Sequence, residues 1–364
     1  MKEGWRYEKL DDLGTIVTGA TPSTNDESNY FPKEYCFVKP SDLPLNGVGS
    51  IHETENYVSS KGLSVSRPLP AGSVLTTCIG TIGKVGLLLQ EGCTNQQINA
   101  VIPNNKINSR YLAYALLSIR KQLEFIANAP VVPIINKKCF SKIHIGYPPK
   151  PTQLSIVSEL DKLNELIRIK KEQLKDYDTL AQSIFYEMFG DPVENEKGWE
   201  VKKFGDLFKL KSGDGLSSKD FKTGIYPVYG GNGISGYHNS FNMKGCYIII
   251  GRVGVYCGNV RKVDGEFWLT DNVFRLTYKE NEQNSFFILY LLNILDLHQY
   301  ANAAAQPVIS NLTLKSIDVP LPPLSLQQSF AHKIEQIERQ KAEVQKAITD
   351  LETLLAARMQ YWFD

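Results

Sequence analysis

The stretch PPKPTQLSIVSELDKLNELI, residues 148–167, has a second version in the same chain, PPLSLQQSFAHKIEQIERQK, residues 322–341. Both versions open with two prolines, and both carry a glutamine four residues after the second proline, Gln153 and Gln327. Proline is tolerated in the first turn of a helix, and spaced apolar residues follow in each copy. The chain therefore contains the same helix start twice, 174 residues apart, which indicates an internal duplication.

Four further pairs of segments agree in the same order along the chain, as a tandem repeat of whole domains requires. They are GWRYEKLDDL (4–13) with GWEVKKFGDL (198–207), GTIGKVG (80–86) with GRVGVYCG (251–258), TNQQ (94–97) with TDNV (270–273), and ANAPVVPII (127–135) with ANAAAQPVI (301–309). We infer that the chain consists of two copies of one ancestral unit.

A heptad pattern follows each helix start. Apolar residues recur at alternating steps of four and three, the spacing of a coiled-coil seam, and Lys170 and Lys341 interrupt it. So narrow an apolar stripe needs another helix, and we expect the two copies to pair antiparallel, with homodimerisation through the same stripe as the alternative. The predicted interface residues are Ile156, Leu160, Leu163, Ile167, Leu174, Tyr177 and Ile184 in the first helix and Phe330, Ile334, Ile337, Val344, Ile348, Leu351 and Leu355 in the second.

The segments before each long helix have the pattern of mixed domains. Short runs rich in valine, isoleucine and aromatic residues, bounded by Gly, Pro and Asn, predict strands. One helix per domain is predicted, over residues 109–127 and 284–301. The predicted fold class is α+β, with two tandem mixed α/β domains separated and joined by two long antiparallel coiled-coil helices about a pseudo two-fold. The expected domains are 1–150 and 191–324, and the expected helices are 151–190 and 325–364.

Composition limits the class of protein. The 364 residues are 42% hydrophobic and 22% charged, without an apolar run that could span a membrane or a signal-peptide core, so we expect a cytoplasmic protein. Six scattered cysteines without a CxxC pair argue against a zinc site or a disulfide framework. The net charge of +1 permits a local cluster of cations for nucleic acid but does not reveal one.

No motif predicts a catalytic or metal site within this chain. GTIGKVG resembles a phosphate loop, but Cys78 and Val85 stand where the Walker pattern needs Gly and Ser or Thr, so a turn between strands is favoured. The five histidines lack metal-ligand spacing, and GxSxG and HExxH are absent. The Gly-rich segment YGGNGISGY (229–237) is either a plain hairpin or a loop that lets backbone approach a phosphate.

In this arrangement the chain resembles the specificity subunit of Type I restriction-modification systems. The resemblance rests on the Pro-Pro pairs with Gln153 and Gln327, the GTIG and GRVG turns, YGGNGISGY, and FYEMFGDP (185–192) at the end of the first long helix. It implies that each mixed domain is a target recognition domain for one half of a bipartite, asymmetric site in double-stranded DNA. The helices would set the spacing of the halves and dock two modification subunits.

The resemblance also implies where the chemistry would reside. The modification subunits would bring S-adenosylmethionine and methylate adenine, and two restriction subunits, ATP-dependent nucleases and translocases that use ATP and Mg²⁺, would cleave unmodified DNA. This chain itself would bind no cofactor and would not be an enzyme.

Polar residues in the Gly-rich turns are the candidate DNA contacts. Arg252 and Lys84 are predicted to lie in near-equivalent turns, where either could hold phosphate and Arg252 could bind guanine. Amides such as Asn272 suit adenine edges, although the same residue types also serve turn geometry. The full set is Thr21, Ser23, Lys39, Ser41, Thr81, Lys84, Asn95, Gln96, Tyr229, Asn232, Arg252 and Asn272.

Two other classes of function stay open from the sequence. One is a stand-alone DNA-modifying enzyme, a nuclease or methyltransferase, which the missing motifs disfavour. The other is a coiled-coil scaffold or adaptor with two ligand-binding domains. Two copies of one domain with different loops favour two targets of the same kind, which suits the halves of a DNA site.

Overall fold

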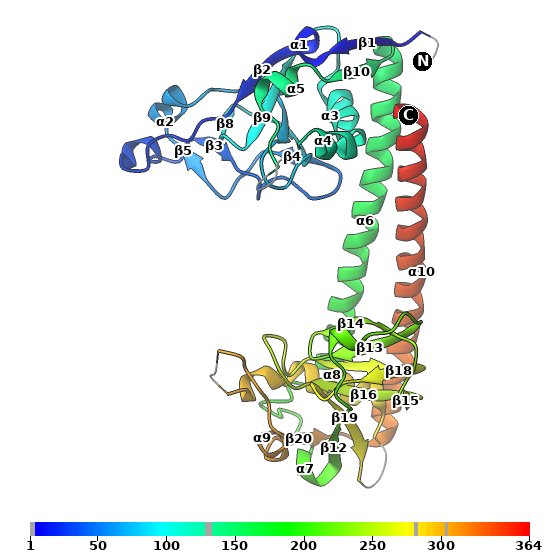
Figure 1. The fold of residues 1–364 in the computed structure, drawn as a ribbon. Helices are drawn as coiled ribbons and strands as arrows, with labels where there is room; N and C mark the ends of the chain where they lie inside the picture. Colours follow the sequence, from blue (N-terminus) through cyan, green and yellow to red (C-terminus); the bar gives the residue numbers. More distant parts are fainter. Residues whose placement is uncertain (1–3, 128–132, 280–282, 303–304) are drawn as a thin grey trace. The chain divides into compact units, whose positions relative to one another are not determined.

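The computed structural model describes residues 4–127, 133–279, 283–302 and 305–364, so parts of ANAPVVPII and ANAAAQPVI lie outside the described residues. The chain forms two compact units of mixed sheet and helix (Figure 1). Unit 1 comprises Met1–Lys171 and Lys346–Asp364, and unit 2 comprises Glu172–Gln345. The long helices α6 (Lys150–Phe189) and α10 (Leu324–Phe363) each continue from one unit into the other.

Unit 1 contains a five-stranded sheet of order β2-β9-β6-β7-β4, a three-stranded sheet β5-β3-β8 and the pair β1-β10. Its strands are β1 Arg6–Lys9, β2 Gly14–Thr18, β3 Tyr35–Val38, β4 Val48–Ile51, β5 Tyr57–Val58, β6 Val74–Thr77, β7 Val85–Leu88, β8 Gly92–Thr94, β9 Ile98–Pro103 and β10 His144–Tyr147. Its short helices are α1 Leu10–Leu13, η1 Glu27–Asn29, α2 Ser60–Val65, α3 Ser109–Ser118, α4 Arg120–Ile126 and α5 Lys137–Ser141.

Unit 2 contains two four-stranded sheets, β12-β19-β16-β17 and β14-β13-β18-β15, and the pair β11-β20. Its strands are β11 Glu200–Lys203, β12 Phe208–Ser212, β13 Tyr226–Gly230, β14 Gly233–His238, β15 Met243–Lys244, β16 Tyr247–Gly251, β17 Val260–Val263, β18 Glu266–Leu269, β19 Val273–Tyr278 and β20 Asp318–Leu321. Its short helices are α7 Phe204–Leu207, η2 Ser218–Asp220, α8 Ser285–Ile294, η3 Leu297–Tyr300 and α9 Asn311–Lys315.

The prediction of one helix before each AN segment was wrong, because both predicted helices are broken. In unit 1 Ile119 leaves helical geometry between α3 and α4. In unit 2 Asp296 has a positive φ of 42° between α8 and η3, a conformation that cannot continue a right-handed helix. Continuous apolar spacing therefore hid an interruption of the helix in each copy.

The duplication is visible in the backbone hydrogen bonds. The N–H of Gly80 donates to the C=O of Pro133 at 3.1 Å in unit 1, and the N–H of Gly254 donates to the C=O of Pro307 at 2.9 Å in unit 2. The pairs β1-β10 and β11-β20 are both antiparallel. The two copies therefore share one framework of strands and turns.

The same bonds correct the predicted alignment of the turns. Cys78 donates its backbone N–H to Gln97 in unit 1, and Arg252 donates its backbone N–H to Asn272 in unit 2. Arg252 therefore corresponds to Cys78, and the segments TNQQ and TDNV align one residue away from the predicted register. A displaced glycine match in the sequence caused the error, because Gly80 corresponds to the second glycine of GRVG.

Arg252 and Lys84 consequently occupy different positions in their turns. The backbone C=O of Lys84 accepts the N–H of Thr77 in unit 1 at 3.0 Å. The matching bond in unit 2 joins the N–H of Gly251 to the C=O of Asn259 at 2.9 Å. Asn259, an uncharged residue, therefore takes the place of Lys84 in the second copy.

The two repeated glutamines fasten each long helix to its own domain. Gln153 and Gln327 are both 0% exposed. The Oε1 atom of Gln153 accepts the backbone N–H of Asn108 at 2.8 Å, and that of Gln327 accepts the N–H of Asn284 at 3.0 Å. These two asparagines are the N-caps of α3 and α8, so each glutamine positions the start of its domain's main helix.

Each glutamine also closes the turn that begins its own helix. The Nε2 group donates to the C=O of Pro148 in unit 1 and to the C=O of Pro322 in unit 2, both at 2.9 Å. Because buried polar groups are costly without partners, a residue that satisfies both sides of the junction stabilises it.

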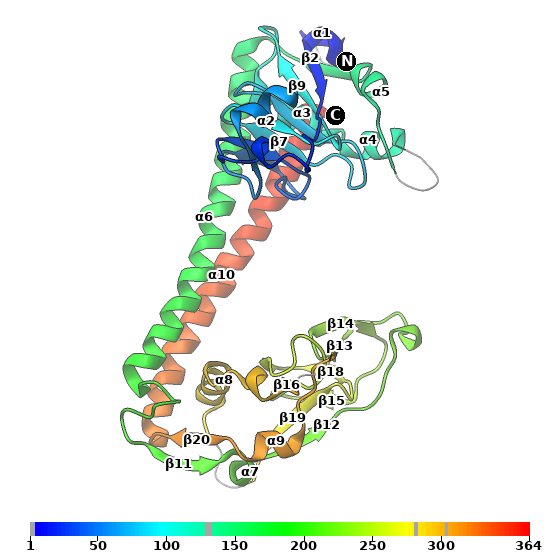
Figure 2. The same cartoon turned by 90° about the vertical axis from the view of Figure 1, so that its left-hand side faces the viewer.

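Within each unit the long helices pair antiparallel and lie side by side (Figure 2). In unit 1 Arg358 binds Glu159, and Lys171 binds Glu352 at 2.7 Å. Later residues of α6 thus meet earlier residues of α10. The predicted fold class, with two mixed domains and two long antiparallel helices, is confirmed.

The heptad residues line the contact between the helices to different degrees. Nine of them are buried: Ile156, Leu160, Leu163, Ile167, Phe330, Ile334, Ile337, Val344 and Ile348. The others are partly buried: Leu174, Tyr177, Ile184, Leu351 and Leu355. Lys341, which interrupts the stripe, reaches Asp178 at 2.8 Å and Glu338 at 3.0 Å. The polar interruption is therefore paired.

Candidate nucleic-acid interface

The candidate residues of unit 1 gather at one edge of its five-stranded sheet. Strands β2 and β6 end there while their antiparallel neighbours β9 and β7 begin there. Strands β3 and β8 end beside them, since the N–H of Asn95 donates to the C=O of Val38 at 3.2 Å. We call the loops at residues 19–23, 39–42, 78–84 and 95–97 the loop edge of unit 1.

Side-chain contacts tie these loops together. The hydroxyl of Thr21 donates to the Oε1 atom of Gln96 at 2.7 Å. The ammonium group of Lys84 donates to the C=O of Pro40 at 2.8 Å, which joins the second and third loops. Thr21 and Gln96 are exposed, whereas Lys39 and Lys84 are half-buried. The structure thus brings these predicted residues onto one surface.

The remaining candidates of unit 1 differ in how free their side chains are. Ser23, Ser41 and Thr81 are exposed. Asn95 is 8% exposed, and its amide bonds to both the side chain and the backbone N–H of Gln97. Asn95 therefore shapes its loop, and the exposed side chains lie around it.

Unit 2 has the corresponding loop edge, where β12 and β16 end and β19 and β17 begin. Its loops hold Arg252, Asn259 and Asn272, and the tip of the hairpin β13-β14 holds Asn232. We call residues 212–214, 229–233, 251–259 and 270–272 the loop edge of unit 2.

Glycines allow the hairpin to approach this edge. A Cβ atom on Gly231 would lie 2.4 Å from the C=O oxygen of Val253, and one on Gly251 would lie 2.5 Å from the oxygen of Gly231. Only glycine permits so close an approach. YGGNGISGY is therefore a hairpin, and its tip, with Tyr229 at its base, lies against the predicted Arg252 turn.

Arg252 has hydrogen-bonding capacity that the described residues leave unused. Its Nη1 atom lies 3.4 Å from the hydroxyl of Ser212 and 3.5 Å from the C=O of Asp271, both long for hydrogen bonds. Its Nε atom is buried without a hydrogen-bond partner among the described residues. The guanidinium lies 5.2 Å from the ring centroid of Phe274, which holds the group in place. A guanidinium so placed can bind a phosphate or a guanine edge.

Two apolar residues at this edge were missed by the sequence analysis. Val255 and Tyr256 are 74% and 53% exposed. They lie in the turn from Gly254 to Gly258, which is one residue longer than the matching turn from Gly80 to Gly83. The extra residue in the second copy of the turn was the feature of the sequence that could have pointed to Val255 and Tyr256.

An exposed cation of unit 1 was also missed. Arg67 donates from Nη1 to the C=O of Thr18 at 2.6 Å, at the end of β2. The sequence offered no motif for it, because it lies far along the chain from the Gly-rich turns.

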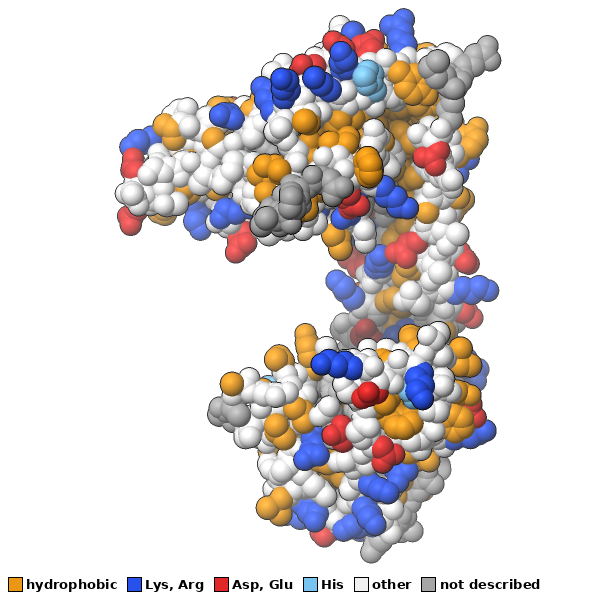
Figure 3. Space-filling model, in the orientation of Figure 1, with side chains coloured by type: hydrophobic (Ala, Val, Ile, Leu, Met, Phe, Trp, Pro, Cys, Tyr) orange, Lys and Arg blue, Asp and Glu red, His pale blue; other side chains and the backbone are white. Residues whose placement is uncertain are grey.

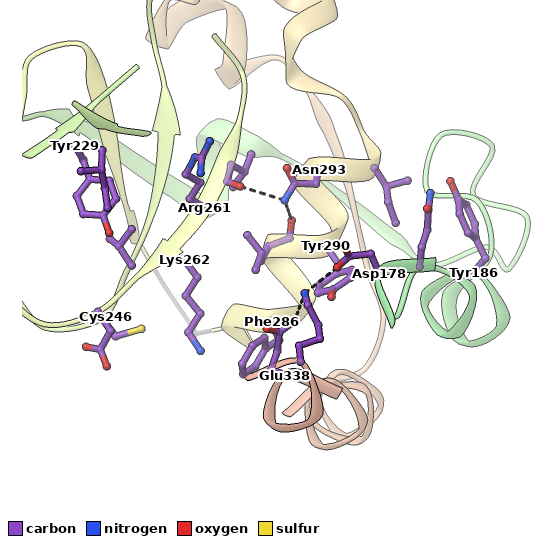
Figure 4. Close-up of a pocket in the computed structure, with 18 residues that line it drawn as sticks. Asp178, Tyr186, Tyr229, Cys246, Arg261, Lys262, Phe286, Tyr290, Asn293 and Glu338 are labelled. Atoms are coloured by element: carbon purple, nitrogen blue, oxygen red, sulfur yellow. Dashed lines mark hydrogen bonds and ion pairs between the residues drawn. The ribbon is translucent and has the colours of Figure 1, made fainter. Parts of the chain in front are cut away.

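A large cavity of about 970 Å³ opens beside the loop edge of unit 2 (Figure 4). Strand β17, helix α8 and parts of the two long helices line it. The ammonium group of Lys262 lies 3.6 Å from the ring centroid of Phe286, and Arg261 donates to the C=O of Asn232 at 3.4 Å. Burial raises the pKa of Tyr290, another lining residue, to about 12, so its phenol is neutral at physiological pH.

The charges are dispersed. On the face of unit 2 drawn in Figure 3, lysine and arginine side chains are interspersed with aspartate and glutamate side chains.

Among the described residues no three His, Cys, Asp or Glu side chains are grouped as metal ligands would be. Nor does any described helix have the length and apolar content needed to cross a membrane.

Two stretches of the chain, residues 2–176 and 196–353, match the Type I restriction modification DNA specificity domain. The chain belongs to this family. Its two matched stretches correspond to the two copies seen in sequence and structure, and the resemblance found in the sequence is confirmed. It is thus a specificity subunit of the Type I restriction-modification class.

The chain is similar in sequence to specificity subunits of Type I restriction enzymes from two organisms. The chain is 24% identical over 340 residues to the EcoprrI specificity subunit of Escherichia coli, covering 87% of this chain and 84% of that one. It is 28% identical over 235 residues to the MjaIX specificity subunit of Methanocaldococcus jannaschii, covering 59% of this chain and only 54% of that one. The match therefore spans about half the length of the archaeal relative.

Solved structures show the same fold. The S subunit from M. genitalium superposes with a TM-score of 0.60 at 16% identity, covering 99% of this chain and 96% of that one. A chain from a study of complex assembly in the type I R-M system superposes with a TM-score of 0.61 at 17% identity, covering 100% of this chain and 98% of that one. At this level of identity, the likeness establishes the fold of the specificity subunits.

Proposed function

We propose that each unit of this specificity subunit reads one half of a bipartite, asymmetric DNA site through its loop edge. The observation that carries the proposal is the repeated edge with different side chains. At matching positions of this edge, unit 1 has the buried Cys78 and the half-buried Lys84, whereas unit 2 has the guanidinium of Arg252 and the exposed amide of Asn259. One framework with two sets of polar side chains suits two half-sites of different sequence.

In this proposal residues 1–150 and 191–324 are the recognition domains, and residues 151–190 and 325–364 are the helices that set half-site spacing and dock two modification subunits. S-adenosylmethionine, ATP and Mg²⁺ act on the modification and restriction subunits, and this chain contributes recognition without catalysis. The complex works in the cytoplasm, on cellular and incoming DNA. The names of the relatives, which are subunits of Type I restriction enzymes, support this assignment.

Selection from a randomised duplex library tests the proposal. With the modification subunit present, the enriched sequences should show two defined halves around an undefined spacer. The chain alone should bind DNA weakly, because its net charge is only +1 and phosphate neutralisation supplies most non-specific affinity. Equal affinity with and without the modification subunit, or a motif of a single block, would contradict it.

Substitution of Arg252 by alanine should relax one half of the selected motif and leave the other intact. A bidentate contact with a base contributes about 1–3 kcal/mol of discrimination. The control is Lys209→Ala, which removes an equal positive charge from an exposed site near the start of β12. The loop edge lies at the other end of that strand. If both variants lose affinity equally and keep the same motif, Arg252 acts only through its charge.

The double substitution of Val255 and Tyr256 by alanine should remove sensitivity to a thymine methyl group in the half-site read by unit 2. Exposed apolar side chains at a reading surface suit contact with that methyl, and its burial contributes about 1 kcal/mol. The measurement is binding to duplexes with uracil in place of single thymines. Leu312→Ala, which alters a residue 78% exposed on α9 of the same unit, is the matched control and should keep that sensitivity.

A further inference from the structure

Among the described residues, the main sheet of unit 2 has four strands, β12-β19-β16-β17, where that of unit 1 has five. In unit 1 the strand β7 lies between β6 and β4, with β4 parallel to it. Strand β17 is the counterpart of β7, since Lys84 before β7 corresponds to Asn259 before β17. Among the described strands, β17 pairs with β16 alone. The position that β4 fills in unit 1 therefore has no strand among the described residues of unit 2.

The cavity of unit 2 occupies that position. In unit 1 the Nη1 atom of Arg110 on α3 donates to the hydroxyl of Ser50 on β4 at 2.8 Å. The residue that corresponds to Arg110 is Phe286, because each is the second residue after the N-cap asparagine of its helix. Phe286 lines the cavity together with the whole of β17 (Figure 4). The space of about 970 Å³ is therefore bounded by Phe286 and β17, the counterparts of the groups that contact β4 in unit 1.

The backbone of β17 turns hydrogen-bonding groups toward this space. In an antiparallel ladder, every second residue directs its N–H and C=O groups toward the neighbouring strand, and the residues between direct theirs away from it. The N–H of Gly251 donates to the C=O of Asn259, so Asn259 and Arg261 face β16. Val260 and Lys262 accordingly direct their N–H and C=O groups away from β16. The C=O of Val260 accepts from the Nδ2 group of Asn293 at 3.3 Å. An open strand edge of this kind is a template for pairing with another chain.

The cavity is lined by three cations and three carboxylates. On β17 and directly after it, two cations, Arg261 and Lys262, stand beside one carboxylate, Asp264, so the strand edge itself favours an acidic segment. Lys341 is already paired with Asp178 at 2.8 Å and with Glu338 at 3.0 Å. Within the described part of the chain, neither Arg261 nor Lys262 forms an ion pair with a carboxylate. These two cations lie on β17 itself, where a paired strand would pass directly beside them.

We propose that an extended, acidic segment of a modification subunit adds to β17 as a parallel strand, in the place that β4 fills in unit 1. This inference rests on the proposed function, because the wall opposite β17 belongs to α6 and α10, which that function assigns to docking modification subunits. Main-chain bonds to Lys262 supply affinity, and contacts with Arg261 and Lys262 supply selectivity for acidic residues.

Hydrogen exchange tests the pairing in the intact chain. Exchange of the amides of residues 258–264 is measured for the specificity subunit alone, with the modification subunit, and with DNA alone. The proposal expects the amide of Lys262 to exchange at least tenfold more slowly when the modification subunit is bound. A complex that forms without protecting this segment overturns the proposal, as does equal protection by DNA alone.

Substitution at Lys262 distinguishes the contribution of its backbone N–H to binding from that of its side chain. Lys262→Pro removes the outward N–H without touching the ladder with β16, and proline is accepted in edge strands. Affinity for the modification subunit should fall at least tenfold for Lys262→Pro and only a few-fold for Lys262→Ala, which keeps the N–H. Equal losses overturn the proposal. If Lys262→Pro does not fold, hydrogen exchange on the unmodified chain still decides.

The outcomes also separate this inference from the proposed function. A bipartite DNA motif together with an unprotected β17 rejects the docking edge and leaves the function standing. Absence of both a bipartite motif and binding to the modification subunit rejects the two together.

Discussion

Replacing Gln327 by leucine should lower the free energy of unfolding of unit 2 by about 2–4 kcal/mol. The substitution keeps the approximate volume but leaves the N–H of Asn284 and the C=O of Pro322 without their present partner in a site that is 0% exposed. Each buried polar group left unsatisfied costs about 1–3 kcal/mol. Two such groups lose their partner at one junction, which gives the expected total of about 2–4 kcal/mol.

Urea unfolding followed by hydrogen exchange in each unit is the measurement, because a two-unit chain need not unfold in one step. Gln328→Leu changes the exposed neighbouring residue and serves as the control. Gln153→Leu should produce the same loss in unit 1 and spare the remote amides of unit 2. A loss below about 0.5 kcal/mol, the range of ordinary surface substitutions, would show that water replaces the glutamine.

Replacing Phe330 by alanine should cost about 3–5 kcal/mol, the usual range for a buried phenylalanine. Its ring centroid lies 5.6 Å from that of Phe185 and 5.3 Å from that of Phe189, both on α6, and 5.4 Å from that of Tyr290 on α8. The ring thus joins three helices of unit 2 at one point. Its removal opens a cavity in a cluster that rigid neighbouring rings cannot easily fill.

Thermal and urea unfolding of the Phe330→Ala variant provide the test, with Leu354→Ala as a control on the same helix. Leu354 is 46% exposed, so its loss should change stability by less than about 0.5 kcal/mol. Phe330→Leu should recover much of the loss, because it refills most of the volume. If Phe330→Ala matches the control, the aromatic cluster repacks and does not fasten α10 to the domain.

Periodic features were predictable because they depend on repetition along the chain. The heptads between Ile156 and Ile184 predict a helix whatever surrounds it, and a second copy 174 residues later predicts its partner. Strand runs bounded by glycine and proline were likewise sufficient for an α+β domain. Candidate residues such as Thr21 and Gln96 came together in space because turns between neighbouring antiparallel strands meet at one edge.

The alignment of the two copies of the turn, the breaks in the helices and the exposure of single side chains were not predictable from the sequence. Glycines are frequent in both turns, so GTIG could be laid over GRVG with the wrong glycine, and only the backbone bonds of Gly80 and Gly254 corrected it. A long apolar run such as residues 109–127 does not reveal where the helix is interrupted. Val255 and Tyr256 were not among the candidates, because the sequence does not show whether an apolar residue is exposed.

The sequence by itself determined the duplication, the two long helices and the class of domain between them, because these follow from local propensity and spacing. Tertiary structure decided what the repeated residues do. Gln153 and Gln327 look like helix-opening residues in the sequence, and the fold makes them the buried links between each long helix and the N-cap of its domain's main helix. It also decided that, among the described strands, β17 has no counterpart of the β4 neighbour that β7 has, since pairing between distant strands depends on which segment reaches the edge.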